Sequence, residues 1–386
     1  MPESPPRPMI RLTGLTKHYP GQAEPAVDHL DLEVPEGEIV VFVGPSGCGK
    51  TTTMKLVNRL IEPTSGRIEI DGRDVTGVDP DRLRRGIGYA IQQTGLFPHR
   101  TVADNIATVP RLLGWGRERI AARVDELLAK VGLDPQTYRD RHPGRLSGGQ
   151  QQRVGVARAL AADPPVLLMD EPFGAIDPLT REALQEEFLR LQRDIRKTIV
   201  FVTHDIDEAV KMGDRIAIFG ECGRVLQYDT PARILGEPAE GFVADFIGNG
   251  TNVRRLSLTR LCEVEVSDDR PVVVRGSGDG GCPTAPGSFA LLVDRDRRPL
   301  GWAEPGQDRP LPLISHLGPE HTLHDALDAM LANNSDTVVV TDQDGRYRGT
   351  VEMATIQTHL HRVGGPGNEG GPVRGGERAD RSIGTS

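Results

Sequence analysis

The sequence predicts an α/β fold with a mostly parallel sheet, followed by a smaller α+β domain. Short apolar segments at residues 166–169, 198–202 and 215–219 are separated by helical patterns. Such alternation is typical of a parallel sheet with crossover helices. A further apolar segment, residues 39–43, leads through a glycine-rich loop into a helical pattern over residues 50–60.

Between these strands, the pattern over residues 96–162 is helical, which predicts a helical subdomain inserted into the α/β fold. The character of the sequence changes after residue 248. We therefore expect a first domain over residues 1–248 and a second over residues 249–363. The segment over residues 364–386 is rich in glycine and poor in apolar residues, so we expect a disordered tail.

Composition narrows the class of protein. The chain has 386 residues, 37% of them hydrophobic and 26% charged, as in ordinary globular proteins. Apolar runs are strand-sized and the N-terminus lacks a secretory pattern, so we expect a cytoplasmic location. The net charge of −9 counts against a nucleic-acid partner. The cysteines are scattered, which suggests neither a zinc site nor a disulfide framework.

The glycine-rich loop matches every fixed position of the phosphate-binding pattern GxxxxGK[ST], and it lies between a strand and a helix as that pattern requires. Its members are Gly44, Pro45, Ser46, Gly47, Cys48, Gly49, Lys50 and Thr51. In such loops the lysine reaches the β- and γ-phosphates and the hydroxyl binds Mg²⁺. We therefore predict a nucleoside-triphosphate site with Mg²⁺, to which Thr52 adds a phosphate contact.

Acidic residues and a histidine follow two other predicted strands. Asp170 and Glu171 come directly after residues 166–169, and His204 follows residues 198–202. Ligands of open α/β sheets bind at the carboxyl ends of the parallel strands. The acids are therefore candidates for the same site as the phosphate loop, whereas a lone histidine at a strand end is usually structural, and only the family resemblance described below gives His204 a role.

A second motif narrows the family. The run Leu146-Ser147-Gly148-Gly149-Gln150 resembles the signature of the ATP-binding cassette (ABC) family, and the family's motifs follow one another in order over residues 9–248. The resemblance implies a P-loop NTPase cassette with a RecA-like core and a helical subdomain. It also implies that Ser147, Gly148, Gly149 and Gln150 cap the γ-phosphate of an ATP held by another subunit, with Ser147 preceding a helix over residues 150–160.

The same resemblance assigns roles to individual residues. Asp170 is the Walker B acid that holds Mg²⁺ together with Thr51, Glu171 is the catalytic base, and His204 is the switch histidine. The Q-loop residue, which contacts Mg²⁺ or water, is Gln92 or Gln93, and the family pattern favours Gln92. Two residues complete the set: Tyr19 stacks on adenine, and Asp177 communicates across the dimer.

The C-terminal domain contains an internal repeat. Residues 290–296 recur 48 positions later as residues 338–344, and the register holds at Gly301/Gly349 and Glu304/Glu352. Each copy is expected to form a strand, an acidic turn and a second strand. A helix over residues 323–331, with Thr322 as its N-cap, is expected before the second copy. The corresponding part of the first copy is rich in Gly and Pro.

Local strings indicate the branch of the family. Residues 58–64, 91–99 and 242–248 resemble ATPases for quaternary-amine (osmoprotectant) uptake, of the glycine betaine, carnitine, choline and proline betaine type. This resemblance implies an importer ATPase at the cytoplasmic face of the membrane. It works as a homodimer or paired cassette, with a multi-span permease and an extracytoplasmic solute-binding protein. The alternatives are an importer for another solute, such as a polyamine or amino acid, and a soluble ABC ATPase without a transport role.

Uptake ATPases of this group commonly carry a tandem of cystathionine-β-synthase-like (CBS) modules, which the C-terminal repeat resembles. Such modules often bind adenosine nucleotides through a Ser/Thr and an Asp. In this chain Glu352 and Thr355 stand at those positions. Because a carboxylate repels a phosphate, we expect a degenerate pair of modules that does not bind a nucleotide. Its expected role is instead to contact the dimer partner and to gate the cassettes. Ionic strength acting on charges such as Asp294, Asp296, Arg297 and Arg298 is the expected signal.

Overall fold

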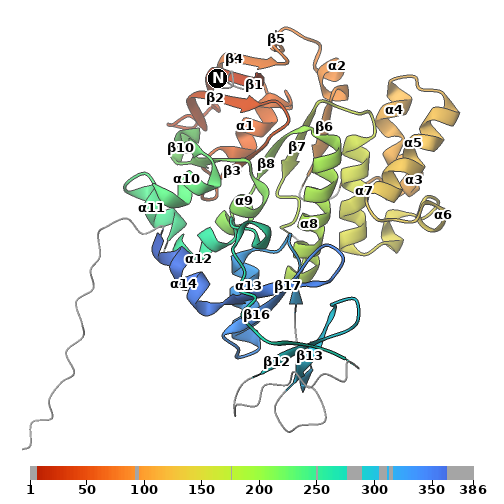
Figure 1. Ribbon diagram of the computed structural model, residues 1–386. Helices are drawn as coiled ribbons and strands as arrows, with labels where there is room; N and C mark the ends of the chain where they lie inside the picture. Colours follow the sequence, from red (N-terminus) through yellow and green to blue (C-terminus); the bar gives the residue numbers. More distant parts are fainter. Residues whose placement is uncertain are drawn as a thin grey trace, which may run out of the picture. The chain divides into compact units, whose positions relative to one another are not determined.

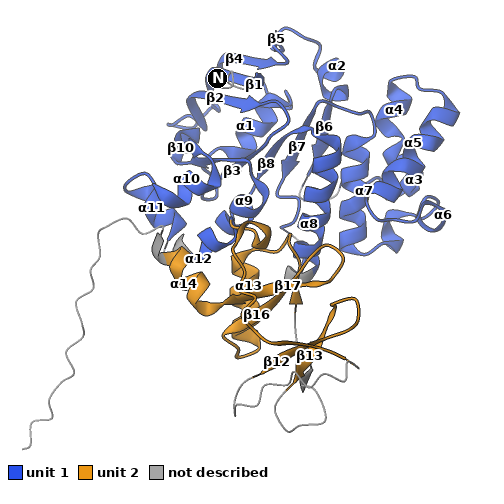
Figure 2. Cartoon of the chain, viewed as in Figure 1, with its two compact units in different colours: residues 1–258 blue, residues 259–386 orange. Residues whose placement is uncertain are grey.

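A computed structural model describes residues 7–91, 95–174, 176–248, 251–275, 289–303, 311–312 and 316–362. The chain divides into two compact units, Met1–Leu258 and Thr259–Ser386, which Figure 2 shows in different colours. No helix in the described ranges combines the length and the apolar character that crossing a membrane requires.

The main sheet of the first unit is parallel except for one edge strand, which confirms the predicted α/β class. Its strands, in spatial order, are β10 (Val225–Asp229), β9 (Arg215–Phe219), β3 (Ile39–Val43), β8 (Thr198–Val202), β7 (Val166–Asp170) and β6 (Ile87–Ala90). The edge strand β10 runs antiparallel to β9. Every residue of the central strands β3 and β8 is buried, as expected where both faces of a parallel sheet are covered.

A second, antiparallel sheet covers one face of the main sheet. Its strands, in spatial order, are β2 (Val27–Pro35), β1 (Pro8–Lys17), β4 (Ser65–Ile70) and β5 (Arg73–Asp74). Alternate side chains of β3 enter different cores. Val40 and Phe42 join the core shared with β1 and β2, whereas Val41 and Val43 join the core shared with the helices of the other face.

Helices fill the rest of the first unit (Figure 1). The predicted helical pattern over residues 96–162 forms α3 (Val102–Ile106), α4 (Thr108–Leu112), α5 (Arg117–Lys130), α6 (Pro135–Tyr138) and α7 (Gly148–Leu160). Within this group α7 contacts both α3 and the edge strand β6. The other helices are α1 (Lys50–Val57), α2 (Pro80–Arg85), α8 (Pro178–Ile195), α9 (Ile206–Met212), α10 (Pro231–Gly236), α11 (Phe242–Ile247) and α12 (Thr251–Leu256).

The first unit extends ten residues beyond the boundary expected at residue 248. Helix α12 packs against α10, Leu256 is buried, and the Arg255 guanidinium donates to the carbonyl oxygen of Leu235 at 2.7 Å. These contacts bind α12 to the cassette. The change of composition marks a linker in sequence, but the contacts place the end of the compact unit at Leu258.

The second unit contains the repeat predicted from the sequence. In both copies a short strand runs parallel to the first strand of an antiparallel hairpin: β11 beside β12 and β13, and β15 beside β16 and β17. The strands are β11 (Val272–Val274), β12 (Ala290–Val293), β13 (Pro299–Ala303), β14 (Leu311–Pro312), β15 (His316–Leu317), β16 (Thr337–Thr341) and β17 (Tyr347–Glu352). Helices α13 (Leu323–Ala332) and α14 (Met353–Arg362) belong to the second copy.

The repeat holds at the level of single hydrogen bonds. The Asp294 carboxylate accepts the backbone N–H of Asp296 and of Arg298, and the Asp342 carboxylate accepts the N–H of Asp344 and of Arg346. Leu292 pairs with Gly301 and Val340 pairs with Gly349, again 48 residues apart. Side chains of both copies, among them Leu291 and Val339, share one core.

Candidate functional site

The phosphate loop connects β3 to α1, and two of its positions require glycine. Gly49 has φ 102°, and a Cβ there would lie 2.6 Å from the carbonyl oxygen of Ala26. Gly44 has φ 152°, and a Cβ there would lie 2.4 Å from the carbonyl oxygen of Phe219. The glycines let the loop pass close to its neighbours and lead directly into α1. Because backbone N–H groups at the start of a helix bind anions, the loop and the start of α1 can together bind a phosphate.

Lys50 is the first residue of α1 and is 6% exposed. Its ammonium donates hydrogen bonds to the carbonyl oxygens of Gly44 at 2.7 Å and Pro45 at 2.8 Å, and it lies 3.5 Å from Cys48 Sγ. The charge is therefore held inside the curve of the loop. An ammonium in this place can meet the phosphates of a nucleotide bound by the loop's N–H groups.

Thr51 and Asp170 meet at the carboxyl end of the sheet, although 119 residues separate them. The Thr51 hydroxyl donates to Asp170 Oδ1 at 3.0 Å. Burial raises the pKa of Asp170, and the hydrogen bond from Thr51 opposes that shift. A hydroxyl and a carboxylate side by side are oxygen donors of the kind that Mg²⁺ prefers, so the residues fit the predicted ion.

Glu171 and His204 also come together, from the ends of β7 and β8. The Glu171 carboxylate lies 3.2 Å from Nδ1 of His204. Glu171 has φ 44°, an uncommon conformation for a residue with a side chain, and its N–H donates to the carbonyl oxygen of Val202 at 2.9 Å. The loop thus turns the carboxylate away from the strand and beside the imidazole, where it can accept a proton from a water molecule.

A carboxylate that the sequence analysis did not single out lines the same region. Glu208, on α9, borders a hollow together with Glu171, His204 and Arg181. Burial raises the pKa of Glu208, and its Oε1 accepts a hydrogen bond from Gln185 at 2.9 Å. The acid occurs four residues after His204, but one acidic residue in a helix carries no sequence signal by itself.

The signature run begins helix α7. Ser147 is the N-cap, and its hydroxyl accepts the N–H of Gln150 while the Gln150 side chain accepts the N–H of Ser147. This reciprocal pair fixes the start of the helix, two residues earlier than predicted. Ser147 and Gly148 are exposed, and a Cβ at Gly148 would meet nothing within 4 Å. A helix N-terminus is thus presented at the surface of the chain.

Of the remaining predicted site residues, the structure describes Tyr19 and Asp177 but not the two glutamines. Tyr19 is half-buried, and the ammonium of Lys17 lies 5.0 Å from the centre of its ring. Asp177 is the N-cap of α8 and accepts the N–H of Thr180 at 3.0 Å, a bond that lowers the pKa of the carboxyl. Gln92 and Gln93, the candidates for the Q-loop, lie outside the described residues, just after β6.

Comparisons with known proteins agree with this geometry. Residues 27–174 match the ABC transporter family. The osmoprotectant import ATP-binding protein OsmV of Salmonella typhimurium is 43% identical over 378 residues, which cover 91% of this chain and 96% of OsmV. The glycine betaine/carnitine/choline transport ATP-binding protein OpuCA of Bacillus subtilis is 58% identical over 240 residues, which cover 62% of each chain.

A solved ATP-binding cassette, a dimer in a post-hydrolysis state bound to ADP and Pi, superposes with a TM-score of 0.52. It is 35% identical in sequence, and the match covers 58% of this chain and 99% of that chain. The cassette fold expected from the motifs is therefore confirmed. The chain belongs to the ABC transporter family, as an ATP-binding subunit that resembles those of osmoprotectant uptake systems.

Proposed function

We propose that this chain hydrolyses ATP to drive import of a quaternary-amine osmoprotectant of the glycine betaine, carnitine or choline type. The observation that carries the proposal is the extent of the similarity to OsmV, which covers 91% of this chain and so includes both compact units. Polyamine and other importers share the cassette. A match that includes the C-terminal unit favours the osmoprotectant group.

In the proposed site, the phosphate loop binds the triphosphate through its N–H groups and Lys50. Thr51 and Asp170, which are 3.0 Å apart, would hold Mg²⁺, which neutralises phosphate charge when bound. Glu171 would accept the proton of the attacking water, and His204, 3.2 Å away, would orient the carboxylate and contact the γ-phosphate. Gln92 is proposed as a further contact to the ion or the water, and Tyr19 as the platform for adenine.

The signature is proposed to act on the nucleotide of a second subunit. Ser147 and Gly148 are exposed at the start of α7, and the side chain of Ser147 is engaged only within its own capping box among the described contacts. An exposed helix N-terminus attracts a phosphate, and the related solved cassette is a dimer. Two copies would then enclose two ATP molecules, with Asp177 near the contact between them.

The partners follow from the transport role. We propose that this chain lies at the cytoplasmic face of the cell membrane, where it binds a multi-span permease, and that an extracytoplasmic solute-binding protein delivers the solute to that permease. The C-terminal unit is proposed as a degenerate CBS-like pair that gates the cassettes. Asp296, Arg297 and Arg298 are exposed and available to respond to salt, whereas Asp294 is half-buried and organises its turn.

Uptake in cells tests the proposal. In cells that carry this chain, Lys50→Ala should abolish uptake of labelled glycine betaine, choline or carnitine, because the cassette can no longer engage the triphosphate. Uptake of labelled spermidine should not change. Loss of spermidine uptake with normal uptake of all quaternary amines would replace the proposal with a polyamine importer.

A further inference from the structure

The segment after α1 is held in an uncommon conformation. Helix α1, which begins at the phosphate loop, ends at Val57, and Arg59 follows with φ 46°. A residue with a side chain adopts such a φ only when its surroundings enforce it. The carbonyl oxygen of Arg59 accepts a hydrogen bond from the guanidinium of Arg84, on α2, at 2.7 Å, and this contact stabilises the backbone conformation of Arg59.

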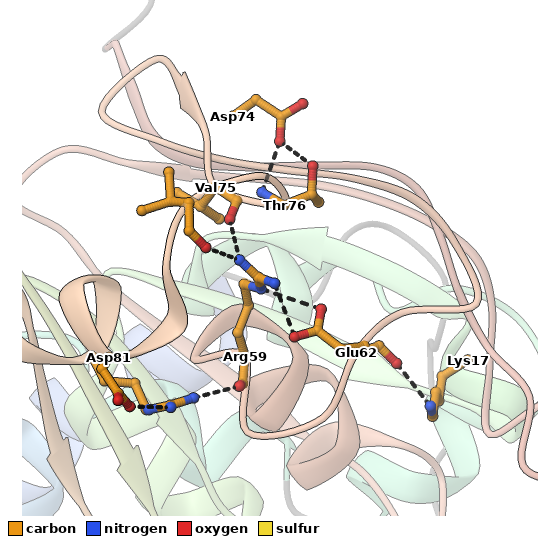
Figure 3. A network of polar contacts seen from close by, with 9 residues as sticks. Lys17, Arg59, Glu62, Asp74, Val75, Thr76 and Asp81 are labelled. Carbon is orange, nitrogen blue, oxygen red and sulfur yellow. Dashed lines mark hydrogen bonds and ion pairs between the residues drawn. The ribbon is translucent and has the colours of Figure 1, made fainter.

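The side chain of Arg59 is 9% exposed and lies at the centre of a polar network (Figure 3). Its guanidinium donates to the carbonyl oxygens of Val75, at 2.8 Å, and of Val78. It also donates two hydrogen bonds to the carboxylate of Glu62, from Nε at 3.2 Å and from Nη2 at 2.9 Å. A two-point contact of this kind fixes the orientation of the acid as well as its distance.

Glu62 and Thr64 also make hydrogen bonds with the segment before Tyr19. The backbone carbonyl oxygen of Glu62 accepts a hydrogen bond from the ammonium of Lys17 at 2.7 Å, on the side away from Arg59 (Figure 3). Two residues on, the hydroxyl of Thr64 accepts the N–H of His18 at 2.9 Å, and the N–H of Thr64 donates to the carbonyl oxygen of Thr16 at 2.8 Å. The segment over residues 59–64 therefore fixes the segment over residues 16–18.

The ammonium that Glu62 holds also lies against an aromatic ring. Lys17 Nζ is 5.0 Å from the centre of the Tyr19 ring, within the range of a cation–π contact. A ring that is already ordered loses less conformational freedom when a base stacks on it. Through Arg59, Glu62 and Lys17, the end of the phosphate-loop helix is thus connected to the residue proposed to bind adenine.

We propose that Lys17 and Arg59 are positioning residues for the adenine platform. Arg59 fixes Glu62, the Glu62 carbonyl holds the Lys17 ammonium on one face of the Tyr19 ring, and the other face receives the base. The inference rests on the proposed role of Tyr19 in binding adenine. It adds that the spacing between the platform and the phosphate loop is set by the segment over residues 59–64.

The test compares two ligands that share phosphates and differ in the base. Calorimetry on the full chain measures the affinity for MgATP and for Mg-tripolyphosphate. Lys17→Gln should weaken MgATP binding about two- to tenfold, the worth of a cation–π contact, and leave tripolyphosphate binding unchanged. Lys17→Arg, which keeps a cation at this position, should bind MgATP as tightly as the wild-type chain does. The matched control is Lys130→Gln, which removes an exposed ammonium from the helical subdomain and should change neither affinity.

Arg59→Lys extends the test to the network. It keeps the charge but cannot make the two-point contact, so it should weaken MgATP selectively as Lys17→Gln does, with the thermal midpoint reporting whether the chain is folded. In a Tyr19→Ala background, Lys17→Gln should have no further effect on MgATP affinity.

The possible results distinguish the positioning role of Lys17 and Arg59 from the proposed role of Tyr19 in binding adenine. If Tyr19→Ala leaves MgATP affinity unchanged, adenine binds elsewhere and both roles are wrong. If Tyr19→Ala weakens MgATP but Lys17→Gln does not, or if Lys17→Gln weakens both ligands equally, only the positioning role is overturned.

Discussion

Replacing Glu171 by Gln separates proton acceptance from the other tasks of this side chain. The Glu171 carboxylate lies 3.2 Å from Nδ1 of His204 and is 25% exposed, so an amide of the same shape fits the same place and keeps an oxygen toward the imidazole. The amide cannot take up a proton from water. Loss of a general base lowers turnover about 10²- to 10⁴-fold, or about 3–5 kcal/mol in activation free energy. Loss of one neutral hydrogen bond would account for only about two- to tenfold.

The assay is steady-state release of phosphate by purified Glu171→Gln protein, with MgATP affinity measured alongside. We expect turnover to fall at least about a hundredfold at unchanged affinity, since a base acts in the chemical step. An ATP-bound dimer should accumulate. The control is Glu186→Gln, which removes an exposed carboxylate of α8. A fall of less than about tenfold would mean that Glu171 only orients other groups, and the assigned base would be wrong.

Three further predictions test other parts of the account. Gly148→Leu should abolish ATP hydrolysis without changing the thermal midpoint or ATP binding by the monomer, because a side chain there meets nothing in its own chain; Gly144→Leu, equally open, should remain active, and an active Gly148→Leu would argue against a partner at the signature. Burial raises the pKa of Glu208 above its ordinary value of 4.5, so its charged form destabilises the fold at neutral pH. Glu208→Gln should therefore raise the melting temperature at pH 7–8, with a gain that shrinks as the pH falls toward 4.5, and a gain independent of pH would contradict this reason. A chain that ends at Leu258 should hydrolyse ATP at the full rate but alter how transport responds to salt, and an unchanged salt response would leave the C-terminal unit without a gating role.

The sequence predicted the parts of the fold that depend on local pattern. Strands β3, β8 and β9 have the predicted limits because buried parallel strands are continuous apolar runs. Thr322 caps α13 as expected, since a capping residue acts within one helical turn. The acidic turns of the repeat recur hydrogen bond for hydrogen bond, because the same residues at the same spacing make the same turn.

Other features depend on contacts between distant segments. The boundary at Leu258 depends on α12 packing against α10, which composition cannot reveal. Thr51 and Asp170 were each predicted as site residues, and their 3.0 Å contact follows from parallel strands that end at one edge. Glu208 was missed, because its partners, Gln185 on α8 and Thr203 in the loop after β8, lie outside its own helix. The role of Arg59 depends on carbonyl groups 16 and 19 residues away, which no motif marks.

The central claim is that each ATP is enclosed by the phosphate loop of one copy and the signature of another. Mixing two inactive variants tests it most directly: Lys50→Ala, which lacks the phosphate-loop lysine, and Ser147→Arg, which blocks the signature. Each alone should be inactive, since both of its composite sites are broken. In an equal mixture, half of the dimers pair the two variants and contain one intact site. We therefore expect recovery of about a quarter of the wild-type hydrolysis rate if the two sites of the symmetric dimer act independently. A mixture no more active than either variant alone would contradict a signature that acts across the dimer.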